Sequence, residues 1–234
     1  MSEYRNELNQ PIGFPVPDWE ARPRPAKERI NGRYCRLEPV NPASHATDLF
    51  AAYQADATGA NWTYMGYGPF ATFAAFESWL TATCLGDDPL FFAIVDAQTD
   101  KAVGVASYLR IVPQMGAIEV GHIHFAPAMQ KTAVATEAMY LMMRYVFDEL
   151  GYRRYEWKCD ALNAGSRKAA LRLGFQFEGV FRQALIYKDR NRDTAWFSII
   201  DQEWPKLKQA FEQWLKPENF DDNGRQRQSL AAFR

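Results

Sequence analysis

One stretch decides how the rest of the chain is interpreted, because in it a predicted strand passes through a loop of small residues into a long predicted helix. It reads Phe125-Ala126-Pro127-Ala128-Met129-Gln130-Lys131-Thr132-Ala133-Val134-Ala135-Thr136-Glu137-Ala138. Backbone N–H groups at a helix start have no partner within the helix, and the helix dipole adds partial positive charge there. The loop therefore suits an anionic group such as a pyrophosphate. A plain strand-to-helix connection is the alternative, since Ala133 and Ala135 stand where such a loop usually carries glycine.

The helix that follows has the clearest periodicity in the chain. Its apolar residues recur at helical spacing over residues 134–150, and Gly151 ends it. Further helices are expected at residues 44–54, 72–85, 164–173 and 204–215. Strands are expected at residues 33–40, 90–95, 102–111, 117–125 and 154–159, followed by two long strands that meet near 189–191. This order predicts an α/β (α+β) layer protein with a mixed sheet.

The two ends of the chain differ from its middle. Residues 1–30 form a proline-rich N-terminal arm that cannot be a helix; its apolar side chains indicate that it packs on something, the alternative being a floppy leader. Residues 31–217 read as one domain. The polar tail, residues 218–234, is expected to fray from Asp221 onward.

Composition excludes several classes of protein. A formal net charge of -1 gives no field that would attract nucleic acid or an anionic membrane. No apolar run is long enough to span a bilayer, and the polar start is no signal peptide. Three widely spaced cysteines argue for a reducing, cytoplasmic compartment and against a disulfide framework or a metal site. No Gly-Lys-Ser/Thr follows the loop, which rules out a P-loop nucleotide site.

Several short motifs on both sides of the long helix together resemble the GNAT acetyltransferase superfamily. They are Ile123-His124-Phe125-Ala126-Pro127, Gln130-Lys131-Thr132-Ala133-Val134-Ala135, Asn163-x-x-Ser166, Leu173-Gly174-Phe175 and Glu178-Gly179-Val180-Phe181-Arg182. The last three look like the RimJ/RimL branch, whose members acetylate protein N-termini and small amines. The resemblance implies a mostly antiparallel sheet flanked by helices and splayed between the fourth and fifth strands. It also implies transfer of an acetyl group from acetyl-CoA to a primary amine by direct attack in a ternary complex.

The resemblance also implies which residues hold acetyl-CoA. Backbone groups of Ile123 and Phe125 would pair with the pantetheine arm. The pyrophosphate would be held by the N–H groups of Lys131, Thr132, Ala133, Val134, Ala135 and Thr136, and Gln130 is a further cofactor-binding candidate. Asn163 would bind pantetheine, and Ser166 would lie near the thiol sulfur. No metal is implied.

Glu119 is the leading candidate for the base, because it precedes Gln130 by the spacing of the strand glutamate in histone-type members. The alternative is a strand carboxylate that pairs with an arginine. His122 and His124 would lie opposite Glu119 on a regular strand. They could relay a proton through water or bind a metal as an H-x-H pair, but no third ligand is evident, which favours packing or surface histidines. The family's usual tyrosine acid is replaced by Ala170, so Ser166 would hydrogen-bond the thiolate unless it only caps its helix.

The aromatic loop after the first predicted helix would form the acceptor wall. Its candidates are Trp62, Tyr64, Tyr67 and Phe70, with packing into the core as the alternative. The arm and the helix at 204–215 offer surfaces for a homodimer. The rival to an enzyme is a non-catalytic CoA-binding regulatory module that keeps the fold. Alanines in the loop and the missing tyrosine favour that rival, whereas Glu119, Asn163 and Ser166 favour an enzyme.

Overall fold

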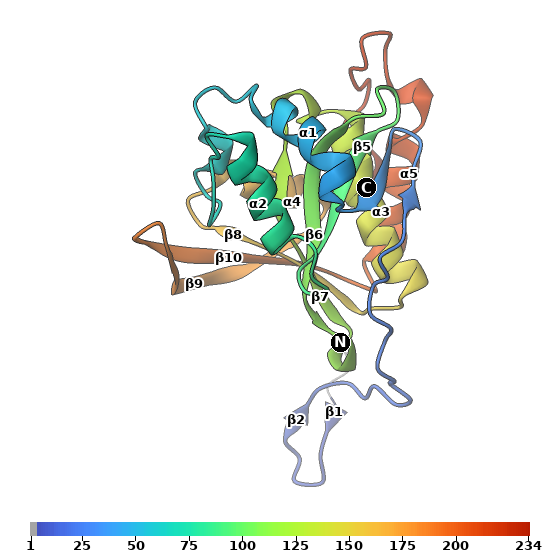
Figure 1. The fold of residues 1–234 in the computed structure, drawn as a ribbon. Coiled ribbons are helices and arrows are strands. Elements are labelled where there is room, and N and C mark those ends of the chain that lie inside the picture. Colours follow the sequence, from blue (N-terminus) through green and yellow to red (C-terminus); the bar gives the residue numbers. More distant parts are fainter. Residues whose placement is uncertain (1–3) are drawn as a thin grey trace.

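The computed structural model describes residues 4–234, and a mixed sheet of eight strands forms its centre (Figure 1). The strands lie in the order β3-β4-β5-β6-β7-β8-β10-β9, and every neighbouring pair is antiparallel except β7 with β8. Their bounds are β3 Ile30–Asn31, β4 Cys35–Pro39, β5 Leu90–Asp96, β6 Ala102–Val112, β7 Ala117–Phe125, β8 Arg154–Asp160, β9 Gln176–Tyr187 and β10 Arg190–Ile200. The predicted mixed, mostly antiparallel sheet is confirmed.

Helices cover both faces of this sheet. The bounds are α1 Pro42–Tyr53, α2 Phe73–Thr83, α3 Ala133–Arg144, α4 Ala164–Leu173 and α5 Trp204–Trp214. Helices α1 and α2 enclose a smaller core with one face of β5 and β6, while α3, α4 and α5 enclose the main core with the opposite face. Successive residues of β5 therefore alternate between the two cores, as a strand buried on both faces requires.

Local sequence signals set where the helices begin. The Asn41 side chain accepts from the N–H of Ala43 and caps α1, and Thr72 caps α2 in the same way through the N–H of Ala75. The long helix differs from expectation at its end. Regular α-helix stops at Arg144 and continues as a π-helical turn, Tyr145–Glu149, before the left-handed Gly151.

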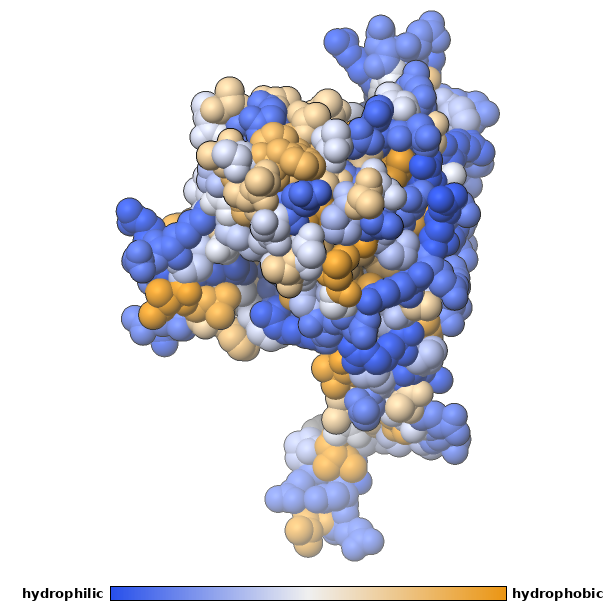
Figure 2. All heavy atoms as spheres, viewed as in Figure 1, coloured by the Kyte–Doolittle hydropathy of each residue, from blue (hydrophilic) through white to orange (hydrophobic). Residues whose placement is uncertain are grey.

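The hairpin of β9 and β10 reaches out from the sheet on the side away from α3 (Figure 1). Strand β9 is the sheet's edge, and it exposes apolar side chains such as Phe181 and Ile186. Figure 2 shows hydrophobic side chains gathered on this hairpin, and more of them on the small N-terminal hairpin. That second hairpin consists of β1 (Tyr4–Arg5) and β2 (Pro11–Ile12).

The second half of the N-terminal arm packs on the domain through Trp19, whereas the apolar Ile12, Phe14 and Val16 stay exposed; residues 1–3 of the arm lie outside the described part. The Trp19 indole donates to the carbonyl of Gln114 at 2.7 Å and lies against Gly116. The N–H of Ala26 donates to the Tyr145 hydroxyl. Between residues 4 and 234, no helix is long and apolar enough to pass through a bilayer.

The expectation that the C-terminal tail frays is wrong. Leu230 is buried in the main core, and the buried Asn219 amide donates to the carbonyls of Trp214 and Gln228. Leu230 and the Asn219 amide therefore hold the largely polar tail, residues 218–234, against α5. The average polarity of the tail does not reveal these two contacts.

Candidate active site

The parallel strands β7 and β8 separate part-way along their length. They are paired only between residues 117–120 and residues 154–157. Beyond Val120, β7 continues along β6 alone, while β8 continues along β10. A cleft of about 1450 Å³ opens between the two strands. This is the expected opening between the fourth and fifth strands of the domain, and it leaves backbone groups of residues 121–125 without a neighbouring strand on one side.

A bulge lies where β7 leaves β8. The register with β6 shifts between Gly121 and His124, and His122 takes a left-handed backbone with φ of 50°. The neighbouring Gly121 lies close to the Leu109 side chain, whose end would have to shift if a Cβ were added at this position. The extra residue reverses the alternation of the strand. His122 and His124 therefore lie on the same face as Glu119, and the expectation that they lie opposite to it is wrong.

The start of α3 forms one wall of the cleft. Thr132 is the N-cap, with its hydroxyl accepting from the N–H of Ala135 and donating to the carbonyl of Met129. Gln130 donates to the carbonyl of Phe125, and Lys131 takes a left-handed backbone with φ of 63°. The loop residues Gln130, Lys131, Thr132, Ala133, Ala135 and Thr136 all line the cleft, whereas Val134 packs against the main core.

A basic residue that sequence reasoning missed stands beside this helix start. The Arg172 guanidinium, on α4, donates to the Thr136 hydroxyl at 3.1 and 3.2 Å. Burial lowers the pKa of Arg172. Lys131, Lys168 and Arg225 also line this part of the cleft. We call the part lined by residues 130–136 and 163–172 the helix end of the cleft.

The start of α4 lies across the cleft from α3. The Asn163 side chain is the N-cap, accepting from the N–H of Ser166 at 3.0 Å, so the capping role considered for Ser166 belongs to Asn163. The Ser166 hydroxyl oxygen accepts from the Trp157 indole at 2.9 Å. Because the indole is only a donor, Ser166 keeps its own hydroxyl hydrogen to donate, and the neighbouring Cys159 sulfur is one acceptor within its reach.

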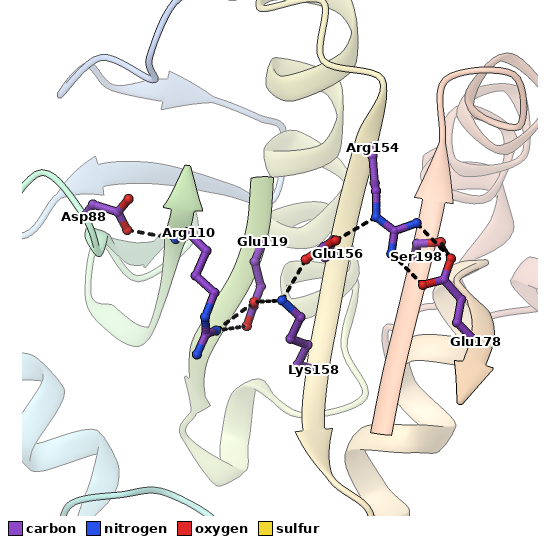
Figure 3. Close-up of polar contacts among 8 residues, drawn as sticks. All are labelled: Asp88, Arg110, Glu119, Arg154, Glu156, Lys158, Glu178 and Ser198. Atoms are coloured by element: carbon purple, nitrogen blue, oxygen red, sulfur yellow. Dashed lines mark hydrogen bonds and ion pairs between the residues drawn. The ribbon is translucent and has the colours of Figure 1, made fainter. Parts of the chain in front are cut away.

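At the other side of the opening, charged side chains line the cleft; Glu119 and Lys158 are buried and Arg110 is exposed. Glu119 is 3% exposed, and its carboxylate accepts from Arg110 at 2.7 and 2.8 Å and from Lys158 at 2.7 Å (Figure 3). Lys158 also bonds Glu156 at 2.7 Å and lies over the Trp196 ring at 3.7 Å. We call this part the ionic end. Its members are Arg110, Glu119, Lys158, Arg192, Thr194 and Trp196.

The ionic end continues a line of charges across the sheet. Figure 3 shows the chain of contacts from Asp88 through Arg110, Glu119, Lys158, Glu156 and Arg154 to Glu178. The pKa of Glu156 is lowered although burial opposes this, because Lys158 and Arg154 hold its charged form. The pairing of Glu119 with an arginine, considered from sequence, is therefore present, with Lys158 as a second cation.

Two histidines lie between the ionic end and the aromatic loop. Burial lowers the pKa of His122 to about 4, with the charge of Arg110 adding to the effect. The Nδ1 atom of His122 lies 2.9 Å from the Tyr67 hydroxyl. Burial also lowers the pKa of His124 to about 4, and its ring stacks on Trp62 at 3.7 Å. Both imidazoles are neutral near pH 7; His124 is a packing residue, whereas His122 faces the cleft.

The aromatic loop divides between cleft and core. Tyr64 and Tyr67 line the cleft. Trp62 and Phe70 do not line it; they pack with α1 and α2 in the smaller core, where large apolar rings lose most contact with water. The Tyr64 hydroxyl donates to the carbonyl of Leu162, and the Lys188 ammonium donates to the carbonyl of Trp62. These two bonds tie the loop to the start of α4 and to the β9–β10 hairpin.

Among residues 4–234, no cluster of three metal-ligating side chains occurs. The ionic-end residues Arg110, Lys158, Arg192 and Trp196 were not predicted from sequence. For Lys158 a signal existed, because the alternation of residues 154–159 places it on the polar face of its strand.

Comparison with known proteins gives the same fold. A GCN5-related N-acetyltransferase from Brucella melitensis superposes with a TM-score of 0.91 at 49% identity, covering 93% of this chain and 99% of that one. An uncharacterised N-acetyltransferase, p20, of Bacillus licheniformis is 30% identical over 48% of this chain and 63% of its own length. A ribosomal-protein-serine acetyltransferase of Escherichia coli K12 is 30% identical over 44% of this chain and 57% of its own length.

The curated relatives are thus matched over little more than half of their own length. The family of the acetyltransferase (GNAT) domain matches residues 35–176, which include the open strands and the starts of α3 and α4. By this match and by the splayed sheet, the chain belongs to the GNAT acetyltransferase family.

Proposed function

We propose that this protein is an N-acetyltransferase that transfers an acetyl group from acetyl-CoA to a primary amine, either a protein N-terminus or a small molecule. The observation that carries the proposal is the continuity of one cleft. Its helix end offers N–H groups and cations, and its ionic end offers a buried carboxylate, with the opening between β7 and β8 joining them. A protein that only bound CoA would need the helix end of the cleft but not the ionic end.

The helix end fits the anionic part of acetyl-CoA. Residues 131–136 would hold the pyrophosphate at the start of α3, where the helix dipole favours negative charge. Arg172 adds a cation beside Thr136. Ala133 and Ala135 allow this approach, because both lie in the first turn of α3 and need no left-handed backbone. Backbone groups of Ile123 and Phe125, which have no neighbouring strand on the cleft side, would bind the pantetheine arm as an added strand, with Asn163 on the facing wall and with Gln130 giving up its bond to the Phe125 carbonyl where the arm needs it.

The transfer itself needs an uncharged amine and a proton for the departing thiolate. When bound, acetyl-CoA supplies the thioester carbon that the amine nitrogen attacks; the new C–N bond forms as the C–S bond breaks. Ser166, whose oxygen accepts from the Trp157 indole, would hydrogen-bond the departing thiolate through its hydroxyl hydrogen, and a water molecule would supply the proton that converts the thiolate to the thiol. Glu119 would take the proton that the amine loses, directly or through a water held by the neutral His122.

Three broader features complete the proposal. The relation to the ribosomal-protein-serine acetyltransferase supports a place in the RimJ/RimL branch. Residues 31–217 would form the catalytic domain, with the arm of residues 1–30 and the tail of residues 218–234 as appendages. Reduced, buried cysteines support a cytoplasmic location, and the exposed apolar hairpins support a homodimer.

Thiol release from acetyl-CoA over a panel of primary amines and short peptides tests the proposal. We expect release that depends on the amine, together with acetylated product by mass spectrometry. Calorimetry of CoA binding runs in parallel. Clear binding of CoA without release on any amine would favour the non-catalytic, CoA-binding module instead.

A further inference from the structure

Strand β10 presents two polar side chains to the cleft that nothing in the described chain satisfies. The Nε atom of Arg192 and the hydroxyl of Thr194 are both buried, and neither has a hydrogen-bond partner within residues 4–234. Thr194 is only 5% exposed. Buried polar atoms in folded proteins nearly always have a partner, so these two point to a group that comes from outside the chain.

The two side chains lie on one face of the sheet. Residues two apart on a strand share a face, and β10 keeps its alternation because the extra residues of the β9–β10 bulge belong to β9, near Gln183. Thr194 is directly opposite Asp160 in β8, and Trp196 is directly opposite Lys158. The intervening Ala195 points into the main core. Arg192 and Thr194 therefore stand on the same wall as Lys158.

Charge pairing sets Arg192 apart from the other cations of the ionic end. Arg110 and Lys158 are both paired with Glu119. Arg192 makes no ion pair or side-chain hydrogen bond with any residue between 4 and 234; its guanidinium lies 5.9 Å from the Tyr187 ring centroid. The Asp160 carboxylate accepts from the Tyr187 hydroxyl and the N–H of Leu162, and within residues 4–234 it forms no ion pair with Arg192. Water can satisfy the Thr194 hydroxyl, but it cannot neutralise Arg192.

The position of this pair is fixed. Lys188, at the turn of the same hairpin, donates to the carbonyl of Trp62 at 2.8 Å, so the hairpin is held against the aromatic loop. Tyr64 in turn holds that loop to the start of α4. An amine that enters between loop and hairpin would pass Arg192 on its way to the opening of the sheet.

From these observations we infer that the acceptor amine carries a carboxylate, which Arg192 and Thr194 bind. A guanidinium fork and a hydroxyl match the two oxygens of a carboxylate, and such charge-assisted bonds orient a planar group well. The inference rests on the proposed function, because it assigns the acceptor class of the same cleft. It predicts amino acids, or peptides with an acidic residue near a free amine, as acceptors.

Matched acceptors test it. Straight-chain amino acids, in which one to five methylenes separate the amine from the carboxylate, are compared with the corresponding carboxamides, and peptides with Asp as second residue are compared with Asn peptides. We expect kcat/KM to favour the carboxylate roughly 10- to 100-fold in at least one pair, as loss of a charge-assisted hydrogen bond implies. Arg192→Met should remove this preference, Thr194→Val should reduce it, and Arg192→Lys should keep part of it.

Arg190→Met is the matched control, because Arg190 is an exposed arginine on the same strand that does not line the cleft. It should leave the preference unchanged. Equal rates for carboxylate and carboxamide in the wild type, with thiol release intact, would overturn the inference and leave the proposed function standing. An effect of Arg190→Met as large as that of Arg192→Met would overturn it too.

Absence of thiol release with every acceptor would instead contradict the proposed function. A binding measurement would then test whether Arg192 and Thr194 still form a carboxylate site. Glutarate is titrated into the full-length protein by calorimetry. Heat of binding that disappears in Arg192→Met supports a carboxylate site in a protein without transferase activity. No binding to the wild type would overturn the site as well.

Discussion

At its helix end the cleft is built from backbone groups and the starts of two helices, whereas at its ionic end it is built from charged side chains on four different strands. The first kind of site comes from segments that are continuous in sequence: residues 130–136 and 163–166. The second depends on the sheet bringing β6, β7, β8 and β10 together. The comparison indicates that binding of the anionic cosubstrate and handling of the amine are separable properties of one cleft.

Glu119→Gln would test the ionic end most severely. With the carboxylate gone, the proton of the amine has no acceptor and Arg110 loses its ion pair, while the buried Lys158 keeps its contact with Glu156, so we expect kcat to fall about 100-fold or more. Affinity for acetyl-CoA should stay near that of the wild type. Rates of thiol release and calorimetry measure the two quantities, and a melting curve shows whether the variant is folded.

Glu178→Gln is the control for that variant, because Glu178 lies at the far end of the same line of charges and does not line the cleft. A change in kcat below about twofold is expected, since pairs that are partly exposed contribute little. If both variants lowered kcat equally, the role of Glu119 would be structural.

Arg172→Met tests the helix end of the cleft. Loss of this cation beside Thr136 should weaken acetyl-CoA binding roughly 10- to 100-fold, as for other charge-assisted contacts. At saturating acetyl-CoA, kcat should be close to that of the wild type. Arg144→Met is the control, because Arg144 pairs only with Glu149 on the surface at 3.8 Å. An unchanged dissociation constant in Arg172→Met would place the phosphates elsewhere.

Ser166→Ala tests the place where the helix end and the ionic end meet, beside the proposed position of the thiol sulfur. Removal of the hydroxyl takes away one hydrogen bond to the thiolate, so kcat should fall about tenfold while binding of CoA changes little. The Trp157 indole loses its acceptor as well, and a melting curve reports that structural part. Full turnover in this variant would remove Ser166 from the mechanism.

The smallest expected effect concerns stability. The pKa of His122 is about 4 in the folded protein against about 6.5 in the unfolded chain, so between these values the unfolded chain binds the proton more readily. The contribution of His122 to the free energy of unfolding is therefore complete above pH 6.5 and declines as the pH falls toward 4. Urea unfolding at pH 7 and pH 5 should show a loss that is about 1–2 kcal/mol smaller in His122→Asn. An identical loss in both proteins would argue against a buried, neutral His122.

The contrast between a site built from continuous segments and a site built from four strands also explains what could be predicted from the sequence. Strands and helices follow from periodicity that is local in the chain, and the splay is implied by the resemblance that the short motifs carry; the fold confirms them. The alternation of β7 fails at Gly121, because the bulge adds a residue that no hydrophobic pattern reveals. Arg110 and Arg192 acquire their place beside the cleft only through pairing between distant strands, which a polarity pattern does not reveal.

The aromatic loop shows a further limit. Four aromatic residues looked equivalent in sequence, yet Tyr64 and Tyr67 line the cleft while Trp62 and Phe70 fill the smaller core. The distinction lies in the polar tip of tyrosine, which finds partners in Leu162 and His122 at the cleft surface.

Measuring two constants in two variants tests the separation of the cleft's ends most directly. The acetyl-CoA dissociation constant and kcat at saturating acetyl-CoA are determined for Glu119→Gln and Arg172→Met beside the wild type. We predict that Glu119→Gln loses kcat and keeps its affinity, and that Arg172→Met loses affinity and keeps its kcat. Equal losses of both constants in both variants, in protein that remains folded, would contradict the assignment of separate roles.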